Sequence, residues 1–189
     1  PSANEADPIT PLSSLDLASR LSFFLWASLP DEELLHLAES GELSRSDVLR
    51  SQARRMLSDP RARSLATDFG GQLWGFDGFE SYTGPDEERF PEFTPELRSA
   101  MLGEVTAFLE AVFMEDRPLI SLLESDTTFV NRPLARHYEL ATDITEDSFV
   151  EVPVGEQRGG LASMGLFLTQ MSPPLRTSPV QRGNWVLEK

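Results

Sequence analysis

Residues 94–115, TPELRSAMLGEVTAFLEAVFME, decide the fold of this chain. Thr94 can cap a helix, Pro95 suits its first position, and Glu96 places an acid in its first turn. Apolar residues then recur at three- and four-residue steps and share one face: Leu97, Met101, Val105, Phe108, Leu109 and Val112. The stretch predicts the longest helix of the chain, standing as the pillar of a helical core.

Helices are also predicted on the N-terminal side of this pillar, over residues 14–29, 31–41, 44–58 and 61–73. The first carries apolar residues around much of its circumference, so we expect it to be buried on more than one side. Ser44, with Asp47 three positions later, resembles a capping box for the third. Glycines, prolines and aromatics mix over residues 74–93 without a helical period. This predicts a long ordered loop whose aromatic side chains pack back onto the helices.

Shorter elements are predicted on the C-terminal side. They are a helix at 118–124, an extended piece at 127–130, a helix capped by Asn131, an edge strand at 149–154, a helix at 159–171, and a last helix opened by Ser178 and Pro179. The expected fold is therefore mainly α: a multi-helix orthogonal or bundle-like domain with a long aromatic loop and at most one short strand pair. Three parts are predicted: a linker (1–12), a helical core domain (13–140), and the truncated start of an adjoining domain packed on the core (149–189).

Composition excludes several classes of function. The chain has 189 residues and a formal charge of −15, which repels nucleic-acid backbones and anionic lipid headgroups. No run of about 18 apolar residues is present, so no membrane insertion is expected. There is no cysteine, which excludes disulfides, thiolate metal sites and a covalently attached haem within this segment.

The usual catalytic patterns are weakly represented. A glycosidase needs two carboxylates about 5–10 Å apart in a cleft, but the acids here stand mainly at helix starts and in polar loops, where capping and solvation explain them. No G-x-S-x-G elbow is present, and Gly159-Gly160 is not followed by the pattern of a phosphate loop. His36 and His137 are 101 positions apart and form no metal-ligand spacing.

A second pattern concerns basic residues. Arg158, Arg176 and Arg182 cluster within 25 residues of an acidic chain, where they can clamp an anion or pin loops by bonding carbonyls. His137 can act as an acid/base or axial ligand, or be a packed, hydrogen-bonded histidine. Together with Asp126 and Asn131, which are nearby in sequence, these four residues make up a candidate site of six. Convergence of His137 and two arginines in one pocket, with a perturbed histidine pKa, would favour an enzyme, whereas scattering would favour a scaffold.

Several segments resemble a known family. Leu15–Leu35, Arg54–Ala62, Phe90–Met101 and Thr127–Leu140 are similar to an uncharacterised domain common in planctomycete and myxobacterial proteins. Arg158–Glu188 resembles the start of the adjoining domain of unknown function in the same proteins.

The resemblance implies a setting but no reaction. Such proteins are large, exported and multidomain, and many carry a c-type cytochrome segment elsewhere in the chain. We therefore expect a helical scaffold or interaction domain of an extracytoplasmic, cytochrome-c-linked protein, with neighbouring domains and a cytochrome as partners and no cofactor in this segment. The alternative is part of a redox or polysaccharide-processing enzyme whose site neighbouring domains complete. No catalytic residues come with the resemblance.

Overall fold

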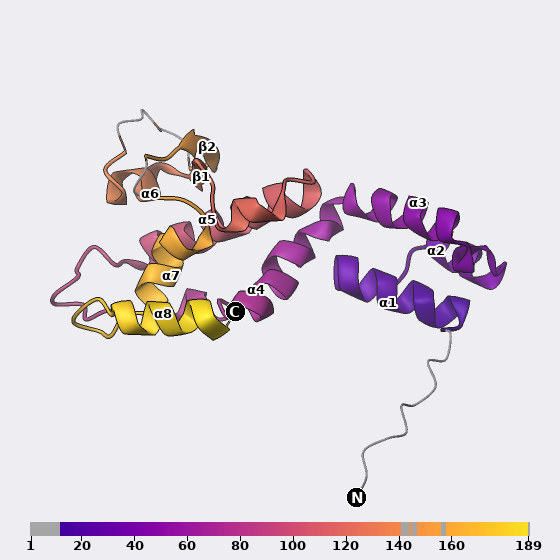
Figure 1. Ribbon diagram of the computed structural model, residues 1–189, viewed down its shortest axis with the longest axis horizontal. Helices are drawn as coiled ribbons and strands as arrows, with labels where there is room; N and C mark the ends of the chain where they lie inside the picture. Colours follow the sequence, from indigo (N-terminus) through magenta and orange to yellow (C-terminus); the bar gives the residue numbers. More distant parts are fainter. Residues whose placement is uncertain (1–11, 141–143, 145–146, 156–157, 189) are drawn as a thin grey trace, which may run out of the picture. The chain divides into compact units, whose positions relative to one another are not determined.

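The computed structural model describes residues 12–140, 144, 147–155 and 158–188 (Figure 1). These residues are mainly helical, with one antiparallel pair of short strands, which confirms the predicted fold class. They form two compact units, Pro1–Ala62 (unit 1) and Arg63–Lys189 (unit 2). The predicted linker lies almost entirely outside the described residues. No described helix has the length and apolarity needed to cross a membrane.

Unit 1 is a small helical cluster. It contains α1 (Ser14–Trp26), α2 (Glu32–Glu39), the 3-10 turn η1 (Glu42–Ser44) and α3 (Ser46–Leu57). Helix α1 packs against the other three elements. Both early helices begin at side-chain caps: the Ser13 hydroxyl accepts from the Asp16 N–H, and the Asp31 carboxylate accepts from the Leu34 N–H.

Two expectations for unit 1 are wrong. Helix α1 is buried along one face, Ala18, Ser22 and Leu25, whereas Leu15 and Phe23 are exposed, because the buried positions follow a single helical stripe. The predicted capping box at Ser44 does not form. Helix α3 begins one residue after Arg45 without a side-chain cap, and Ser44 instead ends η1, with its hydroxyl 2.7 Å from that of Ser14.

The predicted helix at 61–73 is also not one α-helix. The chain passes through a 3-10 turn, η2 (Pro60–Arg63), then a π-helical segment, η3 (Leu65–Phe69), and then a short α4 (Gly70–Trp74). Gly70 follows the π-helical segment, and a Cβ there would meet Leu109 Cδ1 at 2.8 Å. The backbone of this segment therefore lies directly against the central helix.

Helix α5 (Pro95–Met114) is the pillar of unit 2, as predicted. The Thr94 hydroxyl accepts from the Leu97 N–H at 3.2 Å and caps it. The helix contacts η3, the 3-10 turn η4 (Phe79–Ser81), strand β1 (Thr127–Val130), α6 (Arg132–His137) and α7 (Gly165–Gln170). Its buried side chains form the centre of the unit 2 core.

The loop before α5 packs on this core, which confirms the prediction for residues 74–93. Phe76 and Phe79 are almost fully buried. Tyr82 stacks on Phe79 with 5.5 Å between ring centroids, and its carbonyl accepts a hydrogen bond from Arg98 Nη1. The aromatic side chains thus fix the path of a long loop whose regular structure is the short 3-10 turn η4.

The C-terminal half of unit 2 alternates short elements. Strand β1 pairs antiparallel with β2 (Val150–Pro153), which places Thr128 opposite Val152. The other elements are the 3-10 turns η5 (Leu119–Leu122) and η6 (Leu161–Ser163), and α8 (Pro179–Glu188). The prediction of a helix over residues 159–171 is wrong in its first half, because α7 begins only at Gly165. Gly160 has a positive φ and packs on the carbonyls of residues 122 and 123, which interrupts the helix before that point.

Residues on both sides of the predicted domain boundary share one core. Leu161, Met164 and Phe167 pack with α5 and α6 in a single buried cluster. On α8, Trp185 contacts the ring of Phe167, with centroids 5.0 Å apart, while Val180 and Leu187 are largely exposed. The division into domains 13–140 and 149–189 stays a prediction.

Candidate functional site

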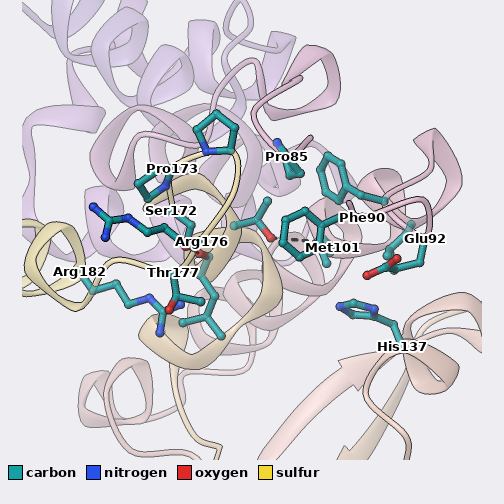
Figure 2. Close-up of a pocket in the computed structure, with 15 residues that line it drawn as sticks. Pro85, Phe90, Glu92, Met101, His137, Ser172, Pro173, Arg176, Thr177 and Arg182 are labelled. Atoms are coloured by element: carbon teal, nitrogen blue, oxygen red, sulfur yellow. Dashed lines mark hydrogen bonds between the residues drawn. The ribbon is translucent and has the colours of Figure 1, made fainter. Parts of the chain in front are cut away.

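A pocket of about 210 Å³ opens in unit 2 between α5, α6, the end of α7 and the start of α8 (Figure 2). Its floor is apolar and its rim carries few polar groups. The lining residues are Pro85, Phe90, Glu92, Phe93, Leu97, Met101, His137, Leu168, Thr169, Ser172, Pro173, Pro174, Arg176, Thr177 and Arg182. An apolar cavity with a few convergent polar groups is the usual form of a small-ligand site.

Three of the six candidate residues line this pocket: His137, Arg176 and Arg182. They come from different elements, His137 from the last turn of α6, Arg176 from the turn after α7, and Arg182 from the first turn of α8. Figure 2 shows Arg176, Arg182 and Thr177 on one side of the pocket and Glu92 with His137 on the other. The fold therefore gathers residues that are 45 positions apart in sequence.

His137 owes its position to a well-defined short helix. The Asn131 side chain accepts a hydrogen bond from the Leu134 N–H at 3.3 Å, so Asn131 is the cap of α6, as predicted, and does not line the pocket. His137 is exposed to solvent, although the surrounding protein partly desolvates its imidazole. This desolvation lowers the pKa of His137, an effect that Arg158 reinforces and Glu92 opposes.

The two arginines of the pocket have no carboxylate partner among the described residues. Arg176 is exposed at the rim. Arg182 is partly buried, and its Nε–H is fully buried without a hydrogen-bond partner among the described residues. The rest of this acidic chain offers many possible partners, so a donor left unpaired at a pocket wall is a notable feature.

Arg158 and Asp126 lie elsewhere. The Arg158 guanidinium stacks over the ring of Tyr138 at 3.8 Å, and its Nη1 donates to the Ser163 carbonyl at 3.4 Å. Asp126 is exposed, and its carbonyl accepts from the Val154 N–H. Both line a second, wide-open depression beside η6, not the pocket of His137. The candidate set thus divides between two places.

Sequence reasoning missed Glu104. This residue of α5 is almost fully buried. Its Oε1 accepts from the Thr128 hydroxyl at 2.7 Å, and its Oε2 accepts from the Tyr138 hydroxyl at 2.5 Å. The Tyr138 oxygen in turn accepts from the Gly165 N–H at 2.7 Å. We call these four residues the Glu104 network. It could have been found from spacing, because Glu104 lies three residues after Met101 on the apolar face of α5.

Burial dominates the chemistry of this network. Desolvation raises the pKa of Glu104 to about 7, although hydrogen bonds from Tyr138 and Thr128 and the charge of Arg158 oppose the shift. Burial also raises the pKa of the Tyr138 phenol well above its usual range, and the adjacent carboxyl adds to that effect. Near neutral pH the Glu104 carboxyl can therefore hold or release a proton inside the core.

The network and the pocket are built from the same three helices. Helix α5 gives Met101 to the pocket and Glu104 to the network, one turn apart. Helix α6 gives His137 to the pocket, and Tyr138 follows directly after it. Helix α7 places Gly165 in the network and Leu168, one turn later, in the pocket. Any change in the network therefore acts on the framework that shapes the pocket.

Other chemistries find less support in the described residues. They contain no group of three histidine or acidic side chains that could hold a metal ion. Among the described residues, Glu92 is the one carboxylate that lines the pocket, so they do not assemble the paired acids of a glycosidase there. His36 is exposed on α2 of unit 1. What the pocket can do is bind an apolar body and an anion.

Comparison with known proteins gives a family and no activity. The family model PSD4, described as a protein of unknown function (DUF1592), matches residues 12–140. The comparisons with curated proteins and with solved structures gave no match.

Proposed function

The chain belongs to the DUF1592 family of proteins of unknown function, and from that premise we propose that it is a helical scaffold or interaction domain whose pocket in unit 2 recognises an apolar group. The observation that carries the proposal is the pocket itself. Phe90, Leu97 and Met101 give it an apolar lining, and it is also lined by Arg176 and Arg182, which have no carboxylate partner among the described residues. Burying an apolar surface of this kind favours association by about 25 cal/mol per Å² of area removed from water.

We place this domain in a large, extracytoplasmic, cytochrome-c-linked protein, with neighbouring domains and a cytochrome as its partners. The sequence resemblance supports the setting, and two features of the chain agree with an interaction role. The acidic balance suits a basic partner such as a cytochrome. Helix α8 exposes Val180, Val186 and Leu187, an apolar strip available to another domain. Fractionation of the native cells with an antibody to this chain tests the location: recovery in the cytoplasm would contradict it.

The alternative is part of a redox or polysaccharide-processing enzyme completed by neighbouring domains. One observation favours it: His137 lines the same pocket as Arg176 and Arg182, with a lowered pKa. The lining speaks against polysaccharide hydrolysis in this pocket, because Glu92 is the one carboxylate among the described residues that line it, and hydrolysis of a glycosidic bond usually needs two. Haem spectroscopy of the full-length protein with His137→Ala tests an axial-ligand role, which an unchanged spectrum would exclude.

The recognition pocket is tested by titrating the chain with benzyl alcohol, a neutral aromatic probe, and following amide NMR signals. We expect shifts centred on Met101 and Thr169. Thr169→Trp should fill the pocket and abolish them. Thr83→Trp is the matched control, since Thr83 is an exposed loop threonine outside the pocket, and should leave them unchanged. Shifts that survive Thr169→Trp, or no binding at all, would refute the proposal.

A further inference from the structure

The pocket is chemically two-ended. Its apolar floor lies between two polar sides: Arg176 and Arg182 with Thr177 on one, and Glu92 with His137 on the other (Figure 2). An anion is attracted to the arginine side and repelled by the Glu92 carboxylate. The lining therefore sets the orientation of an anionic ligand. Its negative charge lies toward α8, and its apolar part lies on the apolar lining of the pocket.

The feature of the pocket that points most directly to a ligand is the buried Nε–H of Arg182. Elsewhere in the chain, arginines with buried or half-buried guanidiniums have partners: Arg55 binds Asp31, Arg117 binds Glu151 and Glu115, and Arg98 binds the Tyr82 carbonyl. Arg182 has a fully buried Nε–H and no such partner among the described residues. A buried charged donor without an acceptor is costly, so the site is arranged for an acceptor that a ligand brings.

The size of the pocket limits that ligand. A volume of about 210 Å³ admits one aromatic ring or a branched aliphatic chain with a short acidic arm. A guanidinium presents parallel N–H groups that match the two oxygens of a carboxylate. Arg176 and Arg182 bring two positive charges to the lining and Glu92 brings one negative charge, so a ligand with a single negative charge balances the pocket when His137 is neutral.

We infer that this pocket binds a small monocarboxylic acid with an aromatic or branched aliphatic body, its carboxylate held by Arg182 and Arg176. The inference rests on the recognition function proposed above and names its ligand class. Thr169 and Met101 contact the body, and Arg182 supplies the directional contact. Arg176, which is exposed, contributes mainly long-range attraction that salt weakens.

The test compares three probes of similar size by NMR titration: phenylacetate, neutral 2-phenylethanol and phenyl phosphate. We expect phenylacetate to bind about tenfold or more tightly than 2-phenylethanol, the factor typical of one charged hydrogen bond. Arg182→Ala should remove this preference, and Arg182→Lys should keep part of it. Arg50→Ala, an exposed arginine of unit 1 that changes the net charge equally, should leave it intact.

The outcomes separate the two proposals. Equal binding of phenylacetate and 2-phenylethanol, with both lost in Thr169→Trp, would leave the recognition pocket standing and overturn the ligand class. Tighter binding of phenyl phosphate than of phenylacetate would also overturn the carboxylate assignment. A preference for phenylacetate that persists in Arg182→Ala would show that Arg182 is not the clamp. If none of the three probes binds, both the recognition pocket and the ligand class are refuted.

Discussion

The Asp31 and Asp59 carboxylates of unit 1 and the Glu104 carboxyl of unit 2 are held in opposite ways. In unit 1, Arg55 donates two hydrogen bonds to Asp31, and Arg61 donates two to Asp59; both arginines are partly exposed and lie over the ring of the buried Trp26. These contacts lower the pKa of Asp31 and lower that of Asp59 to about 2. In unit 2, Glu104 is buried with hydroxyl partners only, and its pKa rises to about 7.

The difference shows that the partner and the solvent together decide the charge of a carboxyl group. A guanidinium at a wet surface keeps the acid ionised, whereas hydroxyl donors in a dry core do not compensate the lost hydration. The contribution of Asp31 and Asp59 to the stability of unit 1 should therefore be lost as the pH falls below the ordinary range of aspartate, and that of Glu104 to unit 2 should be lost as the pH rises toward neutrality. Four changes test this contrast.

The largest expected effect is that of Trp26→Ala in unit 1. Trp26 is 3% exposed, donates to the Met56 carbonyl at 2.9 Å, and carries the Arg61 guanidinium 3.4 Å from its ring centroid. Removing it should cost about 3–5 kcal/mol of unfolding free energy, measured by amide hydrogen exchange of residues 14–57. Trp26→Phe keeps most of the packing and should cost clearly less. Equal costs would mean that the hydrogen bond, and not the packed ring, anchors unit 1.

The next effect is the pH dependence of unit 2. Because the folded pKa of Glu104 is about 7 and the reference value is 4.5, the folded state binds its proton more tightly than the unfolded state. This contribution is fully present below pH 4.5 and is lost as the pH rises through about 7. The loss is about 3 kcal/mol, at about 1.4 kcal/mol per pH unit. Urea unfolding at several pH values measures it. Glu104→Gln, which cannot titrate, should flatten the slope, and an unchanged slope would show that another group is responsible.

Tyr138→Phe should cost about 2 kcal/mol in unit 2. The change removes one hydroxyl and leaves two buried groups unpaired, the Gly165 N–H and Glu104 Oε2. Tyr82→Phe is the matched control, because the Tyr82 hydroxyl makes one long bond of 3.5 Å near solvent and should cost less than about 0.5 kcal/mol. Thermal unfolding of both variants measures the difference. Similar costs for the two variants would argue against a special role of the Glu104 network.

Arg55→Lys should have the smallest effect, about 1 kcal/mol in unit 1, because lysine loses the paired contact with Asp31. The pKa of Asp31 is lowered from 3.8, so the stabilisation is present above pH 3.8 and is lost as the pH falls through the folded value. The difference from wild type should shrink in acid and in high salt. Arg54→Lys, an exposed neighbour, should show none of these dependences. A loss that is constant with pH would point to packing instead of pairing.

The sequence predicts those structural features that are determined by neighbouring residues, and not those that depend on tertiary contacts. Helix α5 was predictable because its cap, its proline and its apolar stripe are all contained in the stretch from Thr94 to Met114. The break at residues 60–74 was not, because the approach of Gly70 to Leu109 is a tertiary contact. Likewise, the turn at Gly159 and Gly160 shortens a helix that periodicity alone extends.

The candidate site follows the same rule. The residue types were visible in the sequence, but their grouping was not: Arg176 and Arg182 reach the pocket of His137, whereas Arg158 is directed to Tyr138. Glu104 was passed over because a glutamate on a helix is usually solvated. In the sequence, Glu104 is distinguished only by its position on the apolar face of α5. The packing of α6 and α7 against that face shows why a carboxyl group can be buried there.

The π-helical segment Leu65–Phe69 has a consequence for mutation. Each residue of an α-helix turns the chain by about 100°, so one residue too many in a turn rotates everything after it. Leu65 and Ala66 are buried at the start of the segment, and Gly70 and Gly71 are buried directly after it. Deletion of a single residue from this segment should restore a regular α-helix and rotate Gly70 away from Leu109. A larger side chain would then meet α5. The number of residues in this stretch is therefore as constrained as their identities. One-residue deletions should be less tolerated here than substitutions of exposed side chains.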